Sequence, residues 1–127
     1  MPSQINNQYA DEAQSRWPEQ YAQSERNLAK LNDQEKRQLF DLGKQITAQI
    51  AQLFETKFSA NSAEVQAQIG NHYRWLCQFW TPTADTYRGM GEMYAADERF
   101  TAYYDGFAVG LAPFMSEAMT NYAARNL

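Results

Sequence analysis

The chain has very little of several residue types that mark whole classes of protein. Its 127 residues include one cysteine, one histidine and four prolines. A single cysteine excludes an internal disulfide, which fits a reducing compartment, so we expect a cytoplasmic protein. No apolar run approaches the roughly 20 residues of a membrane span, and the polar residues 1–4 do not begin a signal peptide. One histidine and one cysteine cannot assemble a zinc site, so no metal or other cofactor is expected.

Clustered basic charge is also missing. The formal net charge is −4, the pI is about 4.9, and the eleven lysines and arginines are scattered. Nucleic-acid binders need a basic face to neutralise phosphates, so this chain alone is not expected to bind DNA or an anionic membrane. The sequence has no Gly-rich phosphate loop and no Gly-x-Ser-x-Gly turn. His72 and Cys77 are five residues apart and would point in different directions on a helix, so a catalytic pair is not expected and the thiol is predicted to be buried. We therefore predict a protein that is not an enzyme.

What the chain has is helical periodicity and no strand pattern. Apolar residues recur at helical spacing in seven segments, which are residues 5–17, 19–31, 34–57, 62–79, 82–95, 97–104 and 109–124. This pattern predicts one all-α domain, residues 1–127, with six or seven helices. The predicted N-caps are Asn32 with Glu35 in a capping box, Asn61, Thr81 before a first-turn proline, and Asp97, while Gly106 ends the sixth segment. Gly43 lies inside the long third segment, where we expect a close helix contact.

The first two segments carry only a thin apolar stripe. Tyr9 and Trp17 are its largest members, set against long polar faces. Short helices of this kind are marginal unless something docks them. We expect residues 1–31 to act as a mobile lid over a core of residues 32–127, and Tyr9 and Trp17 to cover a bound ligand.

Aromatic side chains gather in one stretch. Ten of the eighteen fall between Tyr73 and Phe107. With the methionines they are either core or the lining of a pocket for planar heterocyclic molecules. His72 lies on the apolar face of its helix, and three interpretations remain open for it: a core histidine with a hydrogen-bond partner, a pocket residue, or a haem ligand. The candidate ligand-binding residues are His72, Trp75, Phe79, Tyr87, Met90, Met93, Tyr94 and Tyr104.

Several short phrases in this stretch occur together in a known family. In order they are His72 with Trp75, Gly-Glu-Met-Tyr at residues 91–94, Asp-Glu-Arg-Phe at residues 97–100, Tyr-Asp at 104–105, and Gly-Leu-Ala at 110–112 followed by Phe114. The chain resembles the TipA-S antibiotic-recognition domain, the effector domain of thiostrepton-induced regulators. The resemblance spans nearly the whole chain and is dense between residues 72 and 118.

The resemblance implies a globin-like helical fold without haem and a deep cleft for bulky antibiotics. It implies a small-molecule sensor of a MerR-type transcription regulator, whose DNA-binding part would lie outside this chain, or a free-standing protein that sequesters drug. The isolated domain is expected to be a monomer. Where the family prototype carries a cysteine that captures its ligand, this chain has Gly89, so we expect reversible binding. The alternative is a structural or protein-interaction domain whose aromatic cluster is simply core.

Overall fold

The computed structural model describes residues 18–127, and this part of the chain contains six α-helices and no strand. The helices are α2 (Pro18–Ala29), α3 (Asp33–Glu55), α4 (Ala63–Leu76), α5 (Ala84–Ala96), α6 (Glu98–Asp105) and α7 (Leu111–Asn126). The predicted all-α class is confirmed. The predicted helix at residues 5–17, with Tyr9 and Trp17, lies outside the described residues.

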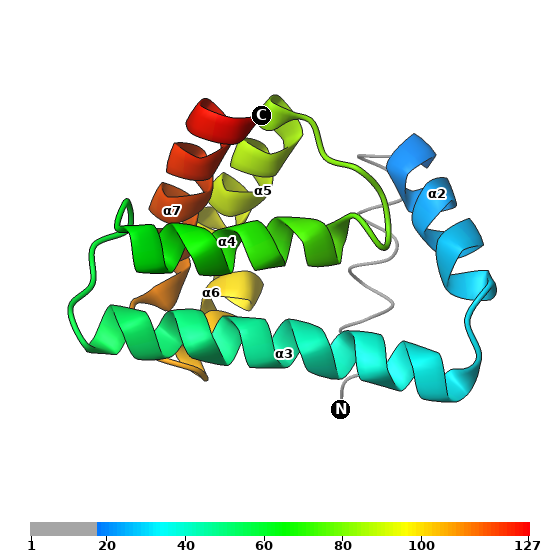
Figure 1. Cartoon of the computed structure of the whole chain (residues 1–127), viewed down its shortest axis with the longest axis horizontal. Coiled ribbons are helices and arrows are strands. Elements are labelled where there is room, and N and C mark those ends of the chain that lie inside the picture. Colours follow the sequence, from blue (N-terminus) through cyan, green and yellow to red (C-terminus); the bar gives the residue numbers. More distant parts are fainter. Residues whose placement is uncertain (1–17) are drawn as a thin grey trace.

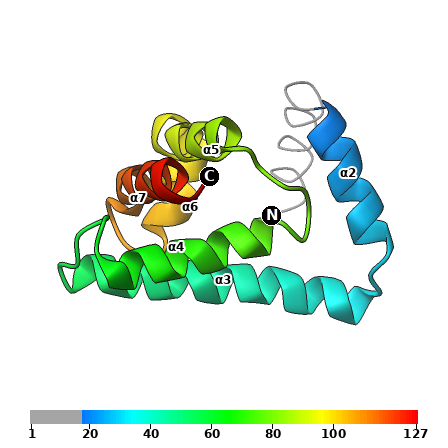
Figure 2. The same cartoon turned by 45° about the horizontal axis from the view of Figure 1, so that its top comes forward.

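Two antiparallel helix pairs form the body of the domain. One pair is α3 with α4, the other is α5 with α7, and the short α6 lies between the two pairs (Figures 1 and 2). Helix α2 stands beyond the N-terminal end of α3 and buries no residue of its own. The Asn27 side chain ties α2 to the rest of the domain, since its Nδ2 donates to the Phe79 carbonyl at 2.6 Å.

The core fills the space between the pairs. Its fully buried large side chains come from α3, α4, α5 and α7, and are Ile50, Val65, Ile69, Tyr87, Leu111, Met115 and Met119. Helices α5 and α7 approach closely at Gly91, where a Cβ would lie 3.0 Å from the Ser116 Cα on α7. None of the described helices is both long enough and apolar enough to span a membrane.

The helix boundaries test the predicted caps. The Asn32–Glu35 capping box, the Asp97 cap and the stop at Gly106 are confirmed. The Asn61 cap is wrong by one residue, because the Ser62 side chain accepts from the Val65 amide. The Thr81 cap is also wrong. Thr83 caps α5 instead.

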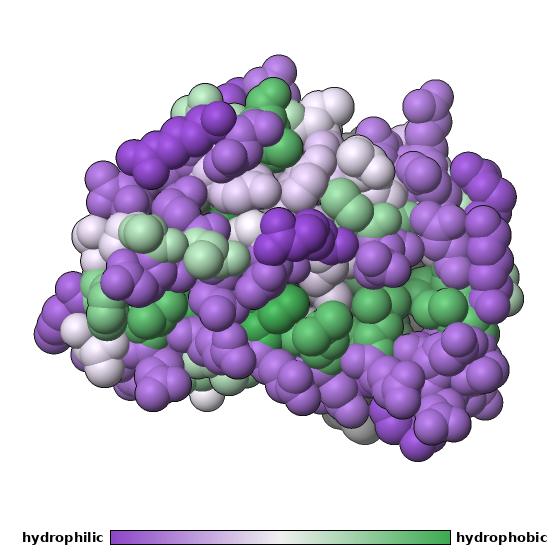
Figure 3. Space-filling model, viewed as in Figure 1, coloured by the Kyte–Doolittle hydropathy of each residue, from purple (hydrophilic) through white to green (hydrophobic). Residues whose placement is uncertain are grey.

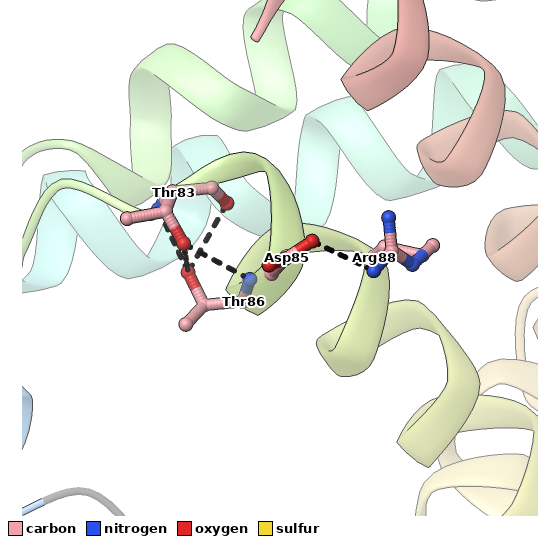
Figure 4. A network of polar contacts seen from close by, with 4 residues as sticks. All are labelled: Thr83, Asp85, Thr86 and Arg88. Atoms are coloured by element: carbon pink, nitrogen blue, oxygen red, sulfur yellow. Dashed lines mark hydrogen bonds and ion pairs between the residues drawn. The ribbon is translucent and has the colours of Figure 1, made fainter.

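Figure 4 shows the α5 start. The Thr83 hydroxyl accepts from the Thr86 amide at 3.2 Å, and the Thr86 hydroxyl accepts from the Thr83 amide at 2.7 Å. An Asp85–Arg88 ion pair of 2.7 Å follows on the exposed face. Reciprocal capping offers two hydrogen bonds, so it outcompetes the single cap that a proline-led start would have made.

Two other predicted boundaries move. Helix α4 ends at Leu76, which leaves Phe79 in the turn that follows. Helix α7 begins at Leu111 and not at residue 109, because Gly110 takes a left-handed φ of 89° that cannot belong to a helix. Pro113 then falls in the first turn of α7, where backbone N–H groups have no helical partner.

Candidate functional site

A cleft of about 730 Å³ opens between α3, α4, α5 and α6. Its lining is mostly apolar and includes six aromatic side chains. The residues are Phe40, Gly43, Lys44, Thr47, His72, Trp75, Tyr94, Phe100, Tyr103 and Tyr104. This volume and lining suit a ligand of drug size or a part of a larger one.

Gly43 sets the position of Trp75. A Cβ at Gly43 would lie 2.5 Å from Trp75 Cζ2 and 2.7 Å from Cε2, so only glycine lets the indole rest on the α3 backbone. The indole Nε1 then donates to the Leu39 carbonyl at 2.8 Å, one turn earlier on α3. The predicted close helix contact at Gly43 is confirmed. It fixes one wall of the cleft, and Phe79 supports the wall from behind, 5.0 Å from the Trp75 ring centre.

His72 lies beside Trp75 on the same wall and is 3% exposed. Its Nδ1 is 2.7 Å from the Tyr87 hydroxyl, which lies 3.4 Å from the Ile69 carbonyl. Burial lowers the pKa of His72 to about 4, so the imidazole is neutral at pH 7. Burial also raises the pKa of the Tyr87 phenol, which keeps its proton.

The one phenolic proton of Tyr87 goes to the Ile69 carbonyl, which can only accept. The Tyr87 oxygen then accepts from His72 Nδ1–H at 2.7 Å, so both contacts are hydrogen bonds. We therefore assign the tautomer in which Nδ1 carries the proton of His72 and Nε2 is an acceptor. Within residues 18–127, no side chain or carbonyl pairs with that Nε2.

Tyrosines and phenylalanines from α5 and α6 form the opposite wall. The Tyr94 ring centre is 5.0 Å from that of Tyr104 and 5.4 Å from that of Phe100, and Tyr103 packs edge-on against Tyr104 at 5.2 Å. Burial raises the pKa of Tyr94 to about 12, although the hydrogen bond with Tyr104 lowers it in part. Burial also raises the pKa of Tyr104 well above its usual value. Both phenols are neutral, and their hydroxyls interact with each other.

Two aspartates hold α6 in place. Asp97 ends α5 and caps α6, where its Oδ1 accepts from the Arg99 amide at 2.9 Å and its Oδ2 pairs with the Arg99 guanidinium at 2.6 Å. Asp105 Oδ1 accepts from the Gly110 amide at 3.1 Å and ties down the loop to α7. The predicted Asp97 cap is confirmed, and Asp105 has a related role in the loop. Together they present the aromatic side chains of α6 to the cleft.

Within residues 18–127, Lys44 carries the one charged side chain of the lining. In that part of the chain no carboxylate lines the cleft and no ion pair joins Lys44 to a carboxylate. No three histidine, cysteine, aspartate or glutamate side chains of these residues are grouped as a metal site would require.

Residues 9–122 match the sequence model of the TipAS antibiotic-recognition domain. The chain belongs to this family. The HTH-type transcriptional regulator SkgA of Caulobacter vibrioides is 31% identical over 117 residues, which are 91% of this chain and 44% of SkgA. The activator mta of Bacillus subtilis is 40% identical over 67 residues, 52% of this chain and 26% of mta. The chain thus spans less than half the length of these curated relatives.

A solved structure shares the fold. TipAS of Streptomyces lividans in complex with nosiheptide, described with a thiopeptide antibiotic multidrug resistance system, superposes with a TM-score of 0.82. The two are 26% identical, and the match covers 94% of this chain and 85% of that one. The globin-like helical arrangement implied by the resemblance is therefore confirmed.

The cleft between α3, α4, α5 and α6 contains some of the residues singled out from the sequence. His72, Trp75, Tyr94 and Tyr104 line it. Phe79 and Tyr87 stand one layer behind, against Trp75 and His72. Met90 and Met93 pack against the core and are not part of the lining, and Tyr9 and Trp17 lie outside the described residues.

Six lining residues escaped the sequence analysis as ligand contacts: Phe40, Gly43, Lys44, Thr47, Phe100 and Tyr103. Phe100 and Tyr103 could have been found, because they share α6 with Tyr104 and lie close to it along the chain. The α3 residues had no local signal, because the other walls of the cleft come from α4, α5 and α6, which follow later in the chain.

Cys77 departs from its prediction. The thiol lies at the C-terminal end of α4 and is half-buried, not buried as expected. The turn after Leu76 explains this, since a residue just past a helix end loses the packing of a helix interior. Cys77 is not among the residues that line the cleft.

A second, shallower groove of about 550 Å³ runs along the outer junction of α3 and α4. Hydrophobic side chains follow this junction among polar ones (Figure 3), and Leu39, Leu42 and Ile46 contribute to the groove. The rest of its lining is mainly amide side chains, from Gln45, Gln49, Gln68, Asn71 and Gln78. Trp75 separates this groove from the aromatic cleft, because it lines both.

Proposed function

We propose that this chain is a ligand-binding domain that holds an antibiotic-like molecule with aromatic or heterocyclic surface in the cleft between α3, α4, α5 and α6. The observation that carries the proposal is the cleft itself, in which six aromatic side chains surround about 730 Å³. Membership of the TipAS antibiotic-recognition family and the likeness to TipAS bound to nosiheptide support it.

We also propose that the domain acts without converting its ligand. The ionisable groups on the cleft walls support this, because His72 is neutral and Tyr94 and Tyr104 hold their protons. None of them is prepared to give or take a proton near pH 7. The half-buried Cys77 is outside the lining, so reversible binding stays our prediction.

The relatives point to the wider setting. SkgA, mta and TipA are HTH-type transcriptional regulators or activators, and this chain matches 44%, 26% and 48% of them. We propose that the domain senses drug for such a regulator in the bacterial cytoplasm, or sequesters drug on its own.

Calorimetric titration with nosiheptide, the ligand of the similar TipAS structure, tests the proposal. We expect binding by the unaltered chain and at least a severalfold weaker affinity for Tyr103→Ala, whose ring lines the cleft yet is 49% exposed and carries little of the fold. Phe58→Ala is the matched control, because Phe58 is 37% exposed and lies outside the cleft. A ligand at a hundred times its dissociation constant would also add about 2.7 kcal/mol to the free energy of unfolding.

Equal weakening by both substitutions would remove the cleft as the binding site. An absence of heat and of thermal stabilisation with nosiheptide and with a panel of other heterocyclic peptide antibiotics would support the structural or interaction role instead.

A further inference from the structure

The charged group among the described residues that line the cleft bears on which ligands the cleft accepts. Lys44 contributes three ammonium donors and a positive charge. The neutral His72 ring offers only its unprotonated Nε2, which accepts.

The other polar groups of the lining carry no charge. The Thr47 Oγ1 donates to the Gly43 carbonyl at 2.9 Å, within its own helix. The phenols of Tyr94 and Tyr104 keep their protons, because burial raises the pKa of each. Tyr103 lies at the exposed edge, and no carboxylate of residues 18–127 lines the space.

A ligand must match this set. An anionic, acceptor-rich edge finds its donor in Lys44, whereas a cationic group would meet the Lys44 charge with no lining carboxylate of residues 18–127 to offset it. Like charges brought together cost affinity.

We propose that the cleft selects planar aromatic ligands whose polar edge carries acceptors, and above all an anionic group that pairs with Lys44, and that it discriminates against cationic analogues. This inference rests on the proposed function and adds the chemical class of ligand. Lys44 is then a specificity-determining residue.

The test is a matched series on one ring system: acridine-9-carboxylate, acridine-9-carboxamide and 9-(aminomethyl)acridine, titrated into the full chain at pH 7. Nosiheptide is titrated into the same samples. We expect the carboxylate to bind about fivefold more tightly than the amide, the upper end for a solvent-facing ion pair, and the amine to bind most weakly. Raising the salt concentration should shrink the preference, since it shortens the screening length.

Variants identify the residue responsible. Lys44→Met keeps the apolar stem but removes the charge, and it should bring the carboxylate and amide affinities together. Lys44→Arg should keep the preference. Lys36→Met is the control on the same helix, because Lys36 does not line the cleft, and it should leave the preference intact.

The two levels of the proposal fail differently. Nosiheptide binding with no preference in the acridine series, or with a preference that survives Lys44→Met, overturns the inference and leaves the proposed function standing. Failure of nosiheptide and of all three acridines to bind overturns both.

Discussion

Replacing Gly43 with alanine should destabilise the domain, although helix propensity alone predicts the opposite. Alanine in a helix interior is favoured over glycine by about 1 kcal/mol. At this position the new Cβ would meet Trp75 Cζ2 at 2.5 Å and Cε2 at 2.7 Å. Carbon atoms in contact prefer about 3.5–4.0 Å, so the indole must retreat by about 1 Å.

That retreat has two costs. Overpacking a close contact typically costs about 1–3 kcal/mol. The indole Nε1 also moves away from the Leu39 carbonyl, now at 2.8 Å, and a hydrogen bond of this kind contributes about 1 kcal/mol. Against a propensity gain of about 1 kcal/mol, we expect Gly43→Ala to lower the free energy of unfolding by about 1–3 kcal/mol. Because Trp75 lines the cleft, nosiheptide affinity should fall as well.

The assay is urea unfolding followed by far-ultraviolet circular dichroism. Gly89→Ala is the matched control, because a Cβ at Gly89 in α5 would meet nothing within 4 Å. It should stabilise the domain by up to about 1 kcal/mol. In a Trp75→Ala background the clash is gone, and Gly43→Ala should become stabilising too. If Gly43→Ala stabilises the otherwise unaltered protein as much as Gly89→Ala does, the close contact between α3 and Trp75 is refuted.

Three further predictions concern other parts of the domain. The pKa of His72 is about 4 in the folded state against 6.5 in the unfolded state, so the stability that depends on neutral His72 is complete above pH 6.5 and is lost as the pH falls from 6.5 to 4. Across this range the free energy of unfolding of the unaltered chain should fall by about 3 kcal/mol more than that of His72→Gln. Parallel pH profiles of the two proteins would contradict this. Amides of α2 (Pro18–Ala29) should exchange with solvent faster than those of α3 in the free protein and slow down with nosiheptide, because α2 buries no residue; equal protection without ligand would remove the lid. Gly89→Cys should form a mass adduct with a dehydroalanine-containing thiopeptide if residue 89 occupies the family's cysteine position, since the site has room for a side chain, whereas Gly89→Ser should form none.

The sequence carries information about the fold where local chemistry decides it. The Asn32–Glu35 box and the Asp97 cap were predictable because each is a contact within four residues. The errors arose where two capping residues stand close together, as with Asn61 and Ser62, since the choice depends on the direction in which the chain leaves the preceding loop.

The site was predictable on one side only. Aromatic residues on α4, α5 and α6 are dense enough along the chain to indicate a pocket, and His72, Trp75 and Tyr94 do line it. Phe40 and Lys44 are invisible to this reasoning, because on α3 alone they look like solvent-facing positions. They become cleft residues only when the fold brings α3 and α6 to the same cleft, a long-range arrangement without a local signature.

Burial distinguishes a binding cleft from a core with many rings. The core closes without the cleft residues, since Ile50, Leu111 and Met115 are fully buried. Phe40 on α3 and Tyr103 on α6, in contrast, are 47% and 49% exposed while lining the same cavity. Apolar surface left in water costs roughly 25 cal/mol for each Å². Rings that served only to stabilise the fold would gain from closing on each other. These rings are held apart because Gly43 fixes Trp75 on one wall and Asp97 fixes α6 on the other. A ligand that covers the rings would remove their apolar surface from water, which stabilises the complex because the fold itself leaves that surface exposed.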